Sequence, residues 1–153
     1  MKIAIIILNY NNSADCRKCI GYLKAQQDVE QEIVVVDNYS RDDDCKAVEA
    51  LCKEQGCTFI ASNENRGYNA GNNVGLRYAA KKGYKFALIA NPDMEFPQKD
   101  YLATLLAKMK ENQAYMWESI YEMDNAEKAF ARSQMEMLDD EQQETINQIV
   151  ALR

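Results

Sequence analysis

The sequence contains no histidine among its 153 residues. Without an imidazole, neither a Ser-His nor a Cys-His nucleophile system can be built, so acid–base chemistry falls to carboxylates, lysine or tyrosine. A long apolar run is also absent, because residues 3–8 are far short of the roughly 20 that span a bilayer. We therefore expect no transmembrane segment and a cytoplasmic location, with any contact to the inner face of the membrane being peripheral.

Positive charge is scarce in the last part of the chain. Residues 1–112 hold 15 basic and 15 acidic side chains, whereas residues 113–153 hold 3 basic and 9 acidic ones, which accounts for the whole net charge of -6. This distribution offers no basic stripe for a nucleic acid backbone, so no nucleic acid partner is expected. A small phosphorylated ligand is still compatible with it.

The five cysteines are an odd number in a chain without a secretion signal, which favours free thiols. Cys16 and Cys19 form a lone C-x-x-C pair inside a predicted helix, with no second pair at zinc spacing. We interpret them as small buried hydrophobic residues; metal or redox use is the alternative.

Short apolar runs alternate with amphipathic segments over the first 90 residues. The runs predict buried strands, and the spacing of apolar residues between them predicts helices, the first capped by Ser13 and the others closed by Gly56 and Gly83. This alternation predicts an α/β fold with a Rossmann-like, mostly parallel sheet and helices on both faces. The expected strands are 3–8, 33–36, 58–61 and 86–90, and the helices are 14–26, a segment carrying Val48, Leu51 and Cys52, and 70–82.

Glycine and proline are absent after Pro97. Met116, Met123 and Met137 recur in an amphipathic stripe, which predicts an all-helical C-terminal tail. We therefore expect a core domain over residues 1–98 and a helical tail over residues 99–153, which packs on the core or forms a homo-oligomer.

Polar clusters follow three of the predicted strands: Asn9-Tyr10-Asn11, Asp37-Asn38 and Asn91-Pro92-Asp93. Ligands of such sheets bind beyond the carboxyl ends of the strands, so these clusters are expected to converge on one crevice. Asp37 has two interpretations. Its carboxylate either accepts a hydrogen bond from a ligand hydroxyl or organises its own loop. Asp93 also has two interpretations. It is either a ligand of Mg²⁺ or Mn²⁺, which substrate phosphates would also bind, or an aspartate that only stabilises its turn.

The segment Asn65–Gly75 has three glycines four residues apart and leads into a helix. Its spacing matches neither a dinucleotide fingerprint nor a P-loop. Close packing of the helix on the sheet explains Gly71 and Gly75 as readily as ligand contact does. Arg66 is either a diphosphate ligand or a solvated side chain.

These motifs together resemble family 2 glycosyltransferases of the GT-A fold, particularly the rhamnosyltransferase-like branch. The resemblance covers about residues 1–100 and is carried by Leu-Asn-Tyr-Asn-Asn, Val-Val-Asp-Asn-Tyr-Ser, Asn-Arg-Gly-Tyr-Asn-Ala-Gly-Asn-Asn-Val-Gly and Asn-Pro-Asp. Asn91 stands where the family's common D-x-D motif has its first aspartate. The acidic triplet Asp42-Asp43-Asp44 is expected to be a solvated helix start.

The resemblance implies that Tyr10 and Asp37 hold the base and ribose of a nucleotide sugar and that Asp93 binds the divalent cation, Mn²⁺ or Mg²⁺. The resemblance does not distinguish UDP-linked from dTDP-linked sugar donors, but similarity to the rhamnosyltransferase-like branch favours dTDP-rhamnose. The residues expected to bind the nucleotide sugar are Asn9, Tyr10, Asn11, Asp37, Asn38, Asn65, Arg66, Gly67, Gly71, Asn72 and Asn91.

The implied reaction is an inverting transfer of the sugar to a glycan or lipid-linked acceptor, which requires a carboxylate base. The family takes that base from a second half that has no counterpart here, and Asp139, Asp140 and Glu141 are better explained as a helix start. The alternative is a catalytically incomplete binding or interaction module that assembles through its tail. A sugar-phosphate nucleotidyltransferase is a third reading, but the glycine and lysine signals expected at its first turn are missing.

Overall fold

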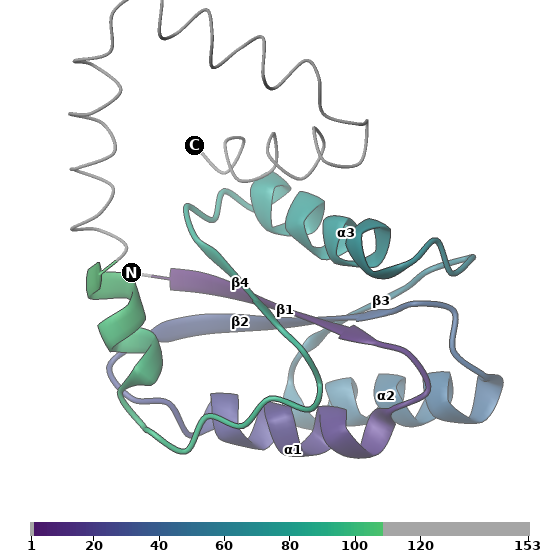
Figure 1. The fold of residues 1–153 in the computed structure, drawn as a ribbon, viewed down its shortest axis with the longest axis horizontal. Helices are drawn as coiled ribbons and strands as arrows, with labels where there is room; N and C mark the ends of the chain where they lie inside the picture. Colours follow the sequence, from purple (N-terminus) through teal and green to yellow (C-terminus); the bar gives the residue numbers. More distant parts are fainter. Residues whose placement is uncertain (1, 109–153) are drawn as a thin grey trace, which may run out of the picture.

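Four parallel strands pair in the order β3-β2-β1-β4 and carry three helices on their two faces (Figure 1). The structure is a computed structural model that describes residues 2–108. Its elements in chain order are β1 (Lys2–Asn9), α1 (Ser13–Lys24), β2 (Glu30–Asp37), α2 (Asp42–Gln55), β3 (Thr58–Ala61), α3 (Tyr68–Lys81) and β4 (Ala87–Ala90).

The register of the sheet aligns the ends of its strands. Asn9, the last residue of β1, lies opposite Asp37, the last residue of β2, and Asp37 in turn lies opposite Ala61, which ends β3. On the other side of β1, Ile7 lies opposite Ala90 at the end of β4. The strand order reverses direction between β1 and β4, which is where open parallel sheets leave a crevice for ligands.

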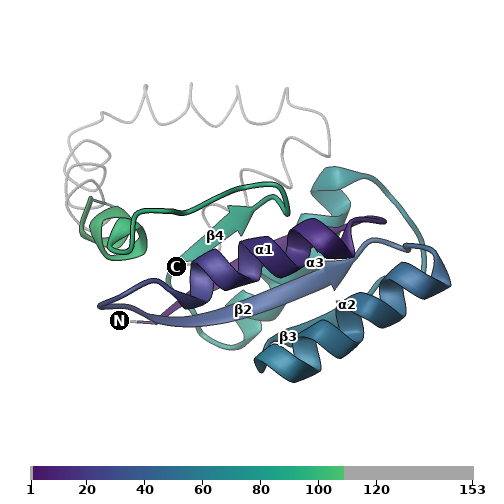
Figure 2. The ribbon, with the colours of Figure 1, turned by 90° about the horizontal axis from the view of Figure 1, so that it is seen from below.

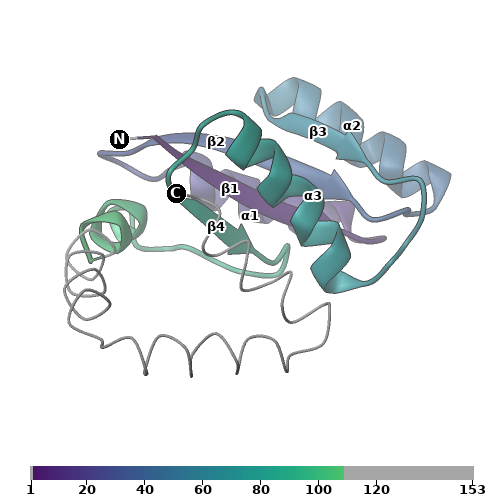
Figure 3. The same cartoon turned by 90° about the horizontal axis from the view of Figure 1, so that it is seen from above.

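The two faces of β1 contribute to two separate apolar clusters. Ile3, Ile5 and Ile7 face α1 and α2, whereas Ile6 and Leu8 face α3. Figures 2 and 3 show α1 and α2 on one side of the sheet and α3 on the other. Because both faces are covered, the strand is apolar from Ile3 to Leu8, and the parallel sheet with flanking helices is confirmed.

Helix α3 packs so closely on β1 that two of its residues must be glycine. A Cβ atom on Gly75 would lie 2.3 Å from Cγ2 of Ile6, and one on Gly71 would lie 2.5 Å from Cδ1 of Leu8. Both distances are far below van der Waals contact. The sequence allowed two explanations for these glycines, close packing and ligand contact, and the structure supports close packing.

Most element boundaries are close to the predicted ones, and β3 matches at both ends. Gly56 closes α2 in the left-handed region, at φ 65°, as expected. The predicted cap of α1 is wrong by one residue, because Asn12 occupies the N-cap position and Ser13 is already helical. Helix α3 starts at Tyr68, two residues before its predicted start, because Gly67 provides the positive φ of 92° at its entry.

The chain after β4 returns to the face that carries α1. Phe96, Leu102 and Leu106 belong to the same apolar cluster as that helix. The side chain of Gln26 fixes this segment, since its Nε2 donates to the Gln98 carbonyl at 2.8 Å and its Oε1 accepts from the Leu102 amide at 3.1 Å. The segment 101–108 is helical, and the rest of the predicted tail, residues 109–153, lies outside the described residues.

A domain boundary near residue 98 stays a prediction. Among the described residues, we find no helix with the length and apolar character needed to cross a membrane.

The cysteines are free thiols, and Cys16, Cys19 and Cys52 are buried in the main core, as predicted for small hydrophobic residues. Burial raises the pKa of the Cys52 thiol to about 12. Burial together with the charge of Asp93 raises that of Cys19 to about 11. These thiols are therefore protonated at neutral pH.

Candidate functional site

A cavity of about 470 Å³ opens at the carboxyl edge of the sheet, where β1 and β4 end. It is lined from three strand ends and from the entry to α3, so the polar clusters after β1, β2 and β4 do meet. The lining residues are Leu8, Tyr10, Asn12, Asn38, Asn65, Gly67, Tyr68, Asn91, Pro92 and Asp93. Six of the residues expected from the sequence are in this set: Tyr10, Asn38, Asn65, Gly67, Asn91 and Asp93.

Two exposed tyrosines border the cavity. Tyr10 follows β1 and Tyr68 begins α3, and each exposes 53% of its surface. Large aromatic rings that stay this accessible beside a cavity can stack on a planar ligand such as a nucleobase. Tyr68 lies in the segment Asn65–Gly75 but is not one of the site residues expected individually from the sequence; the signal that could have found it is an aromatic residue directly after the glycine that precedes the helix.

Asn38 is the residue through which β2 reaches the cavity. Its Nδ2 donates to Oδ1 of Asn65 at 3.0 Å, and its backbone amide donates to the Asn9 carbonyl at 2.8 Å. The first bond ties the end of β2 to the loop before α3, and the second ties it to the end of β1. Asn38 is only 5% exposed, so its place in the cavity wall is fixed before any ligand arrives.

Asn9 and Asp37 lie beneath the cavity and do not line it. Asn9 is fully buried, and its Nδ2 donates to Asp37 Oδ1 at 2.9 Å and to Asp44 Oδ2 at 2.8 Å. The other oxygen of Asp37 accepts the backbone amide of Ser40 at 3.0 Å. Asp37 is 1% exposed, so in this structure it organises the loop, the second of its two sequence interpretations. The expectation that it shares a cavity with Asp93 is wrong for the cavity described here.

Asp44 corrects the expectation that the acidic triplet is solvated. Asp42 and Asp43 are exposed, but Asp44 is 9% exposed and its Oδ1 accepts the backbone amide of Ser13 at 2.9 Å. A carboxylate from α2 thus caps α1 across the fold. Burial raises the pKa of Asp44, but hydrogen bonds from Asn9 and Ser13 outweigh that effect and lower it below the usual value.

Asn11 links the two loops that follow β1 and β2. Its Oδ1 accepts the Arg41 amide at 2.8 Å, and its own amide donates to Oγ of Ser40 at 2.9 Å. The backbone of Asn11 is in the left-handed region, at φ 53°, and so is that of Tyr39, at φ 63°. Asn11 therefore contributes to the shape of the site through these loops, and it does not line the cavity.

The remaining expected residues also lie outside the cavity wall. Arg66 is solvent-exposed and its Nε lies 3.8 Å from Oε1 of Glu64. Gly71 is covered by Leu8, and Asn72, 2% exposed, donates its Nδ2 to the Tyr68 carbonyl at 3.1 Å. Gly71 and Asn72 thus position the helix entry beside the cavity.

Asp93 is the carboxylate of the cavity wall. It projects from a turn in which the Met94 amide donates to the Asn91 carbonyl at 3.0 Å. Its side chain has no hydrogen bond or ion pair within residues 2–108, and that part of the chain holds no group of three or more His, Cys, Asp or Glu residues arranged to bind a metal. One free carboxylate fits a cation that is shared with phosphates and water, and it does not fit an all-protein cage.

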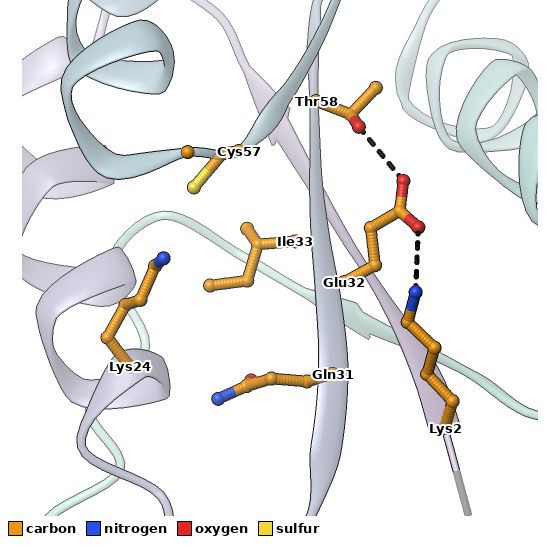
Figure 4. Close-up of a pocket in the computed structure, with 8 residues that line it drawn as sticks. Lys2, Lys24, Gln31, Glu32, Ile33, Cys57 and Thr58 are labelled. Carbon is orange, nitrogen blue, oxygen red and sulfur yellow. Dashed lines mark hydrogen bonds and ion pairs between the residues drawn. The ribbon is translucent and has the colours of Figure 1, made fainter.

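A second cavity, of about 330 Å³, lies at the opposite end of the sheet (Figure 4). Lys24, Gln31 and Cys57 lie on one side of β2 there, and Glu32 points to the other side, toward Thr58 and Lys2. Glu32 Oε1 accepts from Thr58 Oγ1 at 2.9 Å and from Tyr78 at 2.7 Å, and its Oε2 accepts from Tyr84. Since its oxygens are already paired, Glu32 ties elements together and is not free to bind a ligand.

A sequence model of glycosyl transferase family 2 matches residues 4–150 of this chain. Among curated proteins, the low-salt glycan biosynthesis hexosyltransferase Agl10 of Haloferax volcanii is 31% identical over 99 residues, which are 64% of this chain and 30% of that protein.

Solved structures with the same fold include a mannosyltransferase and the protein TarS. The mannosyltransferase PcManGT of Pyrobaculum calidifontis, in complex with GDP-Man and Mn²⁺, is 25% identical with a TM-score of 0.59, over 66% of this chain and 30% of that one. TarS residues 1–349 from S. aureus, in complex with UDP, is 26% identical with a TM-score of 0.60, over 72% of this chain and 32% of that one. The chain thus spans about a third of the length of each of these three matched chains.

Proposed function

Because this chain belongs to glycosyl transferase family 2, we propose that the cavity between β1 and β4 binds a nucleoside-diphosphate sugar. The observation that carries the proposal is the convergence of Tyr10, Asn38 and Asp93, from three strand ends, on one cavity. An aromatic ring, a fixed amide and a free carboxylate are the groups needed for a base, a ribose and a metal-bound diphosphate, respectively.

The charges at the helix ends support an anionic ligand beside α3. The first turns of α1 and α2 carry acidic residues, whereas the first turn of α3 carries none. No acidic side chain of that turn offsets the positive end of the α3 dipole, which therefore favours a negative group. Tyr68 and Gly67, at this helix entry, line the cavity, which favours placing the diphosphate there.

Asp93 is the residue that would hold a divalent cation, Mn²⁺ or Mg²⁺, together with the diphosphate. When bound, the cation offsets the negative charge of the departing nucleoside diphosphate. Mn²⁺ is present in the structure of the related mannosyltransferase, which supports this choice. Asn9, Asn11, Asp37, Gly71 and Asn72 then act by positioning loops and α3, while Tyr10, Asn38, Asn65, Gly67 and Asn91 contact the ligand.

The reaction that we propose is transfer of the sugar with inversion to a glycan or lipid-linked acceptor. It needs a carboxylate to deprotonate the acceptor, and the one carboxylate in the cavity wall, Asp93, is assigned to the cation. We therefore assign the base to none of the residues 2–108. The alternative, a module that binds the nucleotide sugar without transferring it, is favoured by this same observation.

The test is a thermal-shift screen of UDP, GDP and dTDP and of UDP-GlcNAc, GDP-Man and dTDP-rhamnose, each with and without Mn²⁺. GDP and GDP-Man are included because a related structure holds GDP-Man. A ligand at about 100 times its Kd stabilises the folded state by about 2.7 kcal/mol, so the expected result is a clear rise in Tm that is larger with Mn²⁺.

Asp93→Ala is expected to remove the part of this Tm shift that depends on Mn²⁺ and to leave the Tm without ligand nearly unchanged, since Asp93 is exposed. The matched control is Glu95→Gln, an exposed acidic residue two positions later that does not line the cavity. If Asp93→Ala keeps the full Mn²⁺-dependent shift, the metal assignment fails; if no nucleotide shifts the Tm of the native protein, the donor assignment fails.

A further inference from the structure

Asn91, at the tip of β4, has a hydrogen-bond partner for every polar group but one. Its N–H donates to Sδ of Met94 at 3.2 Å. Its carbonyl accepts the Met94 amide at 3.0 Å and the Cys19 thiol at 3.6 Å. Its side-chain Oδ1 accepts the Tyr68 hydroxyl at 2.7 Å. Within the described part of the chain, no partner is present for its Nδ2.

The Tyr68 hydrogen bond determines what Asn91 offers to a ligand. A carboxamide carries one oxygen that accepts and one nitrogen that donates twice, and a bond to the oxygen fixes the orientation of both. Since Oδ1 is held by Tyr68, the group left free is Nδ2, which donates hydrogen bonds. Divalent cations such as Mg²⁺ bind oxygen atoms, so the free end of this side chain suits an oxygen of the ligand.

We propose that Tyr68 is a positioning residue, which orients Asn91 so that the Asn91 Nδ2 donates a hydrogen bond to an oxygen atom of the bound nucleoside-diphosphate sugar. Asn91 therefore does not ligate the cation, and Asp93 is its one protein ligand among residues 2–108. This inference rests on the proposed function of the cavity. It gives Asn91 and Asp93, which flank the same proline, two different tasks.

The geometry of Tyr68 makes this role separable from a structural one. Tyr68 is 53% exposed and is the first residue of α3, so removing its hydroxyl leaves the core packing unchanged. Its hydroxyl nevertheless bridges the first residue of α3 to the residue that follows β4, and both residues line the cavity. Tyr68→Phe keeps the ring beside the cavity and removes the bond to Asn91.

The first test needs no ligand. In ¹⁵N-labelled full-length protein, the side-chain amide signals of Asn91, assigned through Asn91→Ala, are expected to shift in Tyr68→Phe. The matched control is Tyr39→Phe, because Tyr39 is an exposed tyrosine at the same edge of the sheet that does not line the cavity. Unchanged Asn91 signals in Tyr68→Phe would overturn the inference, whatever the protein binds.

The second test is a double-mutant cycle, measured by calorimetry with UDP, UDP-GlcNAc, GDP and GDP-Man as probes in the presence of Mn²⁺. Loss of one hydrogen bond predicts that Asn91→Ala weakens binding about fivefold and Tyr68→Phe about threefold. Because Tyr68 acts through Asn91, the double variant is expected to bind no more weakly than Asn91→Ala. Additive losses would overturn the inference.

Comparison of the probes identifies the oxygen. If it belongs to the nucleoside diphosphate, Asn91→Ala weakens binding of the nucleoside diphosphates and the nucleotide sugars equally; if it belongs to the sugar, only binding of the nucleotide sugars is weakened. Either pattern supports the inference.

The third test separates Asn91 from the cation. The Kd of Mn²⁺ in the presence of the bound nucleoside diphosphate, measured by electron paramagnetic resonance, is expected to change less than about twofold in Asn91→Ala and to rise more than about tenfold in Asp93→Ala. Equal losses of Mn²⁺ affinity in both variants would overturn the division of tasks. A native protein that binds no nucleotide at all would instead overturn the proposed function, and the amide signals would still report on Tyr68.

Discussion

The residues beneath the cavity form a polar network that does not line it. Asn9 holds the carboxylates of Asp37 and Asp44 together, and these two side chains in turn fix Ser40 and Ser13 through their backbone amides. Buried polar groups are stable only when their hydrogen bonds are made. The loops that carry Tyr10 and Asn38 therefore depend on a single carboxamide.

Asn9→Ala is expected to lower the free energy of unfolding by about 1–3 kcal/mol, because two buried carboxylates lose a shared donor. The measurement is urea unfolding at neutral pH. Asn63→Ala, at an exposed position of the loop before α3, is the control and is expected to be near neutral. A change in Asn9→Ala no larger than that of the control would show that the network does not support the fold.

At the scale of elements, helix α3 is fixed by two contacts of different kinds. Its glycines allow it to approach β1, and Tyr78 ties it to Glu32 on β2, the carboxylate that also joins Thr58 and Tyr84. The first contact places the entry of the helix at the cavity, and the second holds the opposite end of the sheet together.

Gly75→Ala is expected to destabilise the fold by about 1–3 kcal/mol, because the added methyl group overpacks the contact with Ile6. Gly21→Ala is the matched control, since no atom lies within 4 Å of its Cβ position and α1 gains helix propensity. That control is expected to be stabilising by up to about 1 kcal/mol. Thermal unfolding of both variants measures the difference, and effects of the same sign would contradict the packing argument.

Glu32 predicts a pH dependence of stability. Burial raises its pKa, but hydrogen bonds from Tyr84, Tyr78 and Thr58 and the charge of Lys2 outweigh that effect and lower it from 4.5 to about 2. Because the folded-state pKa is the lower one, the stabilisation is fully present above pH 4.5 and is lost as the pH falls toward 2. It amounts to up to about 3 kcal/mol.

Urea unfolding of the native protein and Glu32→Gln between pH 7 and pH 3 tests this dependence. The native protein is expected to be more stable than Glu32→Gln at neutral pH. The difference in free energy of unfolding between the two proteins is expected to shrink below about pH 4.5. Glu54→Gln is the control, because its exposed pair with Arg17 is of the kind that contributes little. A difference that stays constant over the range would contradict the role of the Glu32 charge.

At the scale of the whole molecule, the described residues include ten that line the cavity and a core that extends to Leu106. Residues 113–153 differ in composition, with 3 basic and 9 acidic side chains and a methionine-rich stripe. We therefore expect binding of the nucleotide sugar and association between chains to depend on different parts of the sequence.

A variant that ends at residue 112 is expected to keep its affinity for a nucleoside diphosphate within about twofold, because every cavity-lining residue among residues 2–108 is kept. Association of the full-length chain that increases with concentration is expected to be lost in the same variant. Sedimentation and calorimetry of the two proteins measure these effects. A truncated chain that folds but binds no nucleotide would show that residues 113–153 belong to the site.

The sequence by itself determined the α/β alternation, the parallel sheet and the edge at which the polar residues gather. These follow from local features, since apolar runs of strand length and glycines that end helices act within a few residues. The motifs at the strand ends also predicted the family to which the chain belongs.

The tertiary structure decided which of those polar residues face the cavity and which support it. Asp37 and Asn38 are neighbours in sequence, yet the Asp37 carboxylate accepts hydrogen bonds from Asn9 and Ser40, while Asn38 lines the cavity. The capping of α1 by Asp44 and the bond from Tyr68 to Asn91 join residues 31 and 23 positions apart. Such pairings depend on the register of the strands and on the packing of α3, which no local pattern specifies.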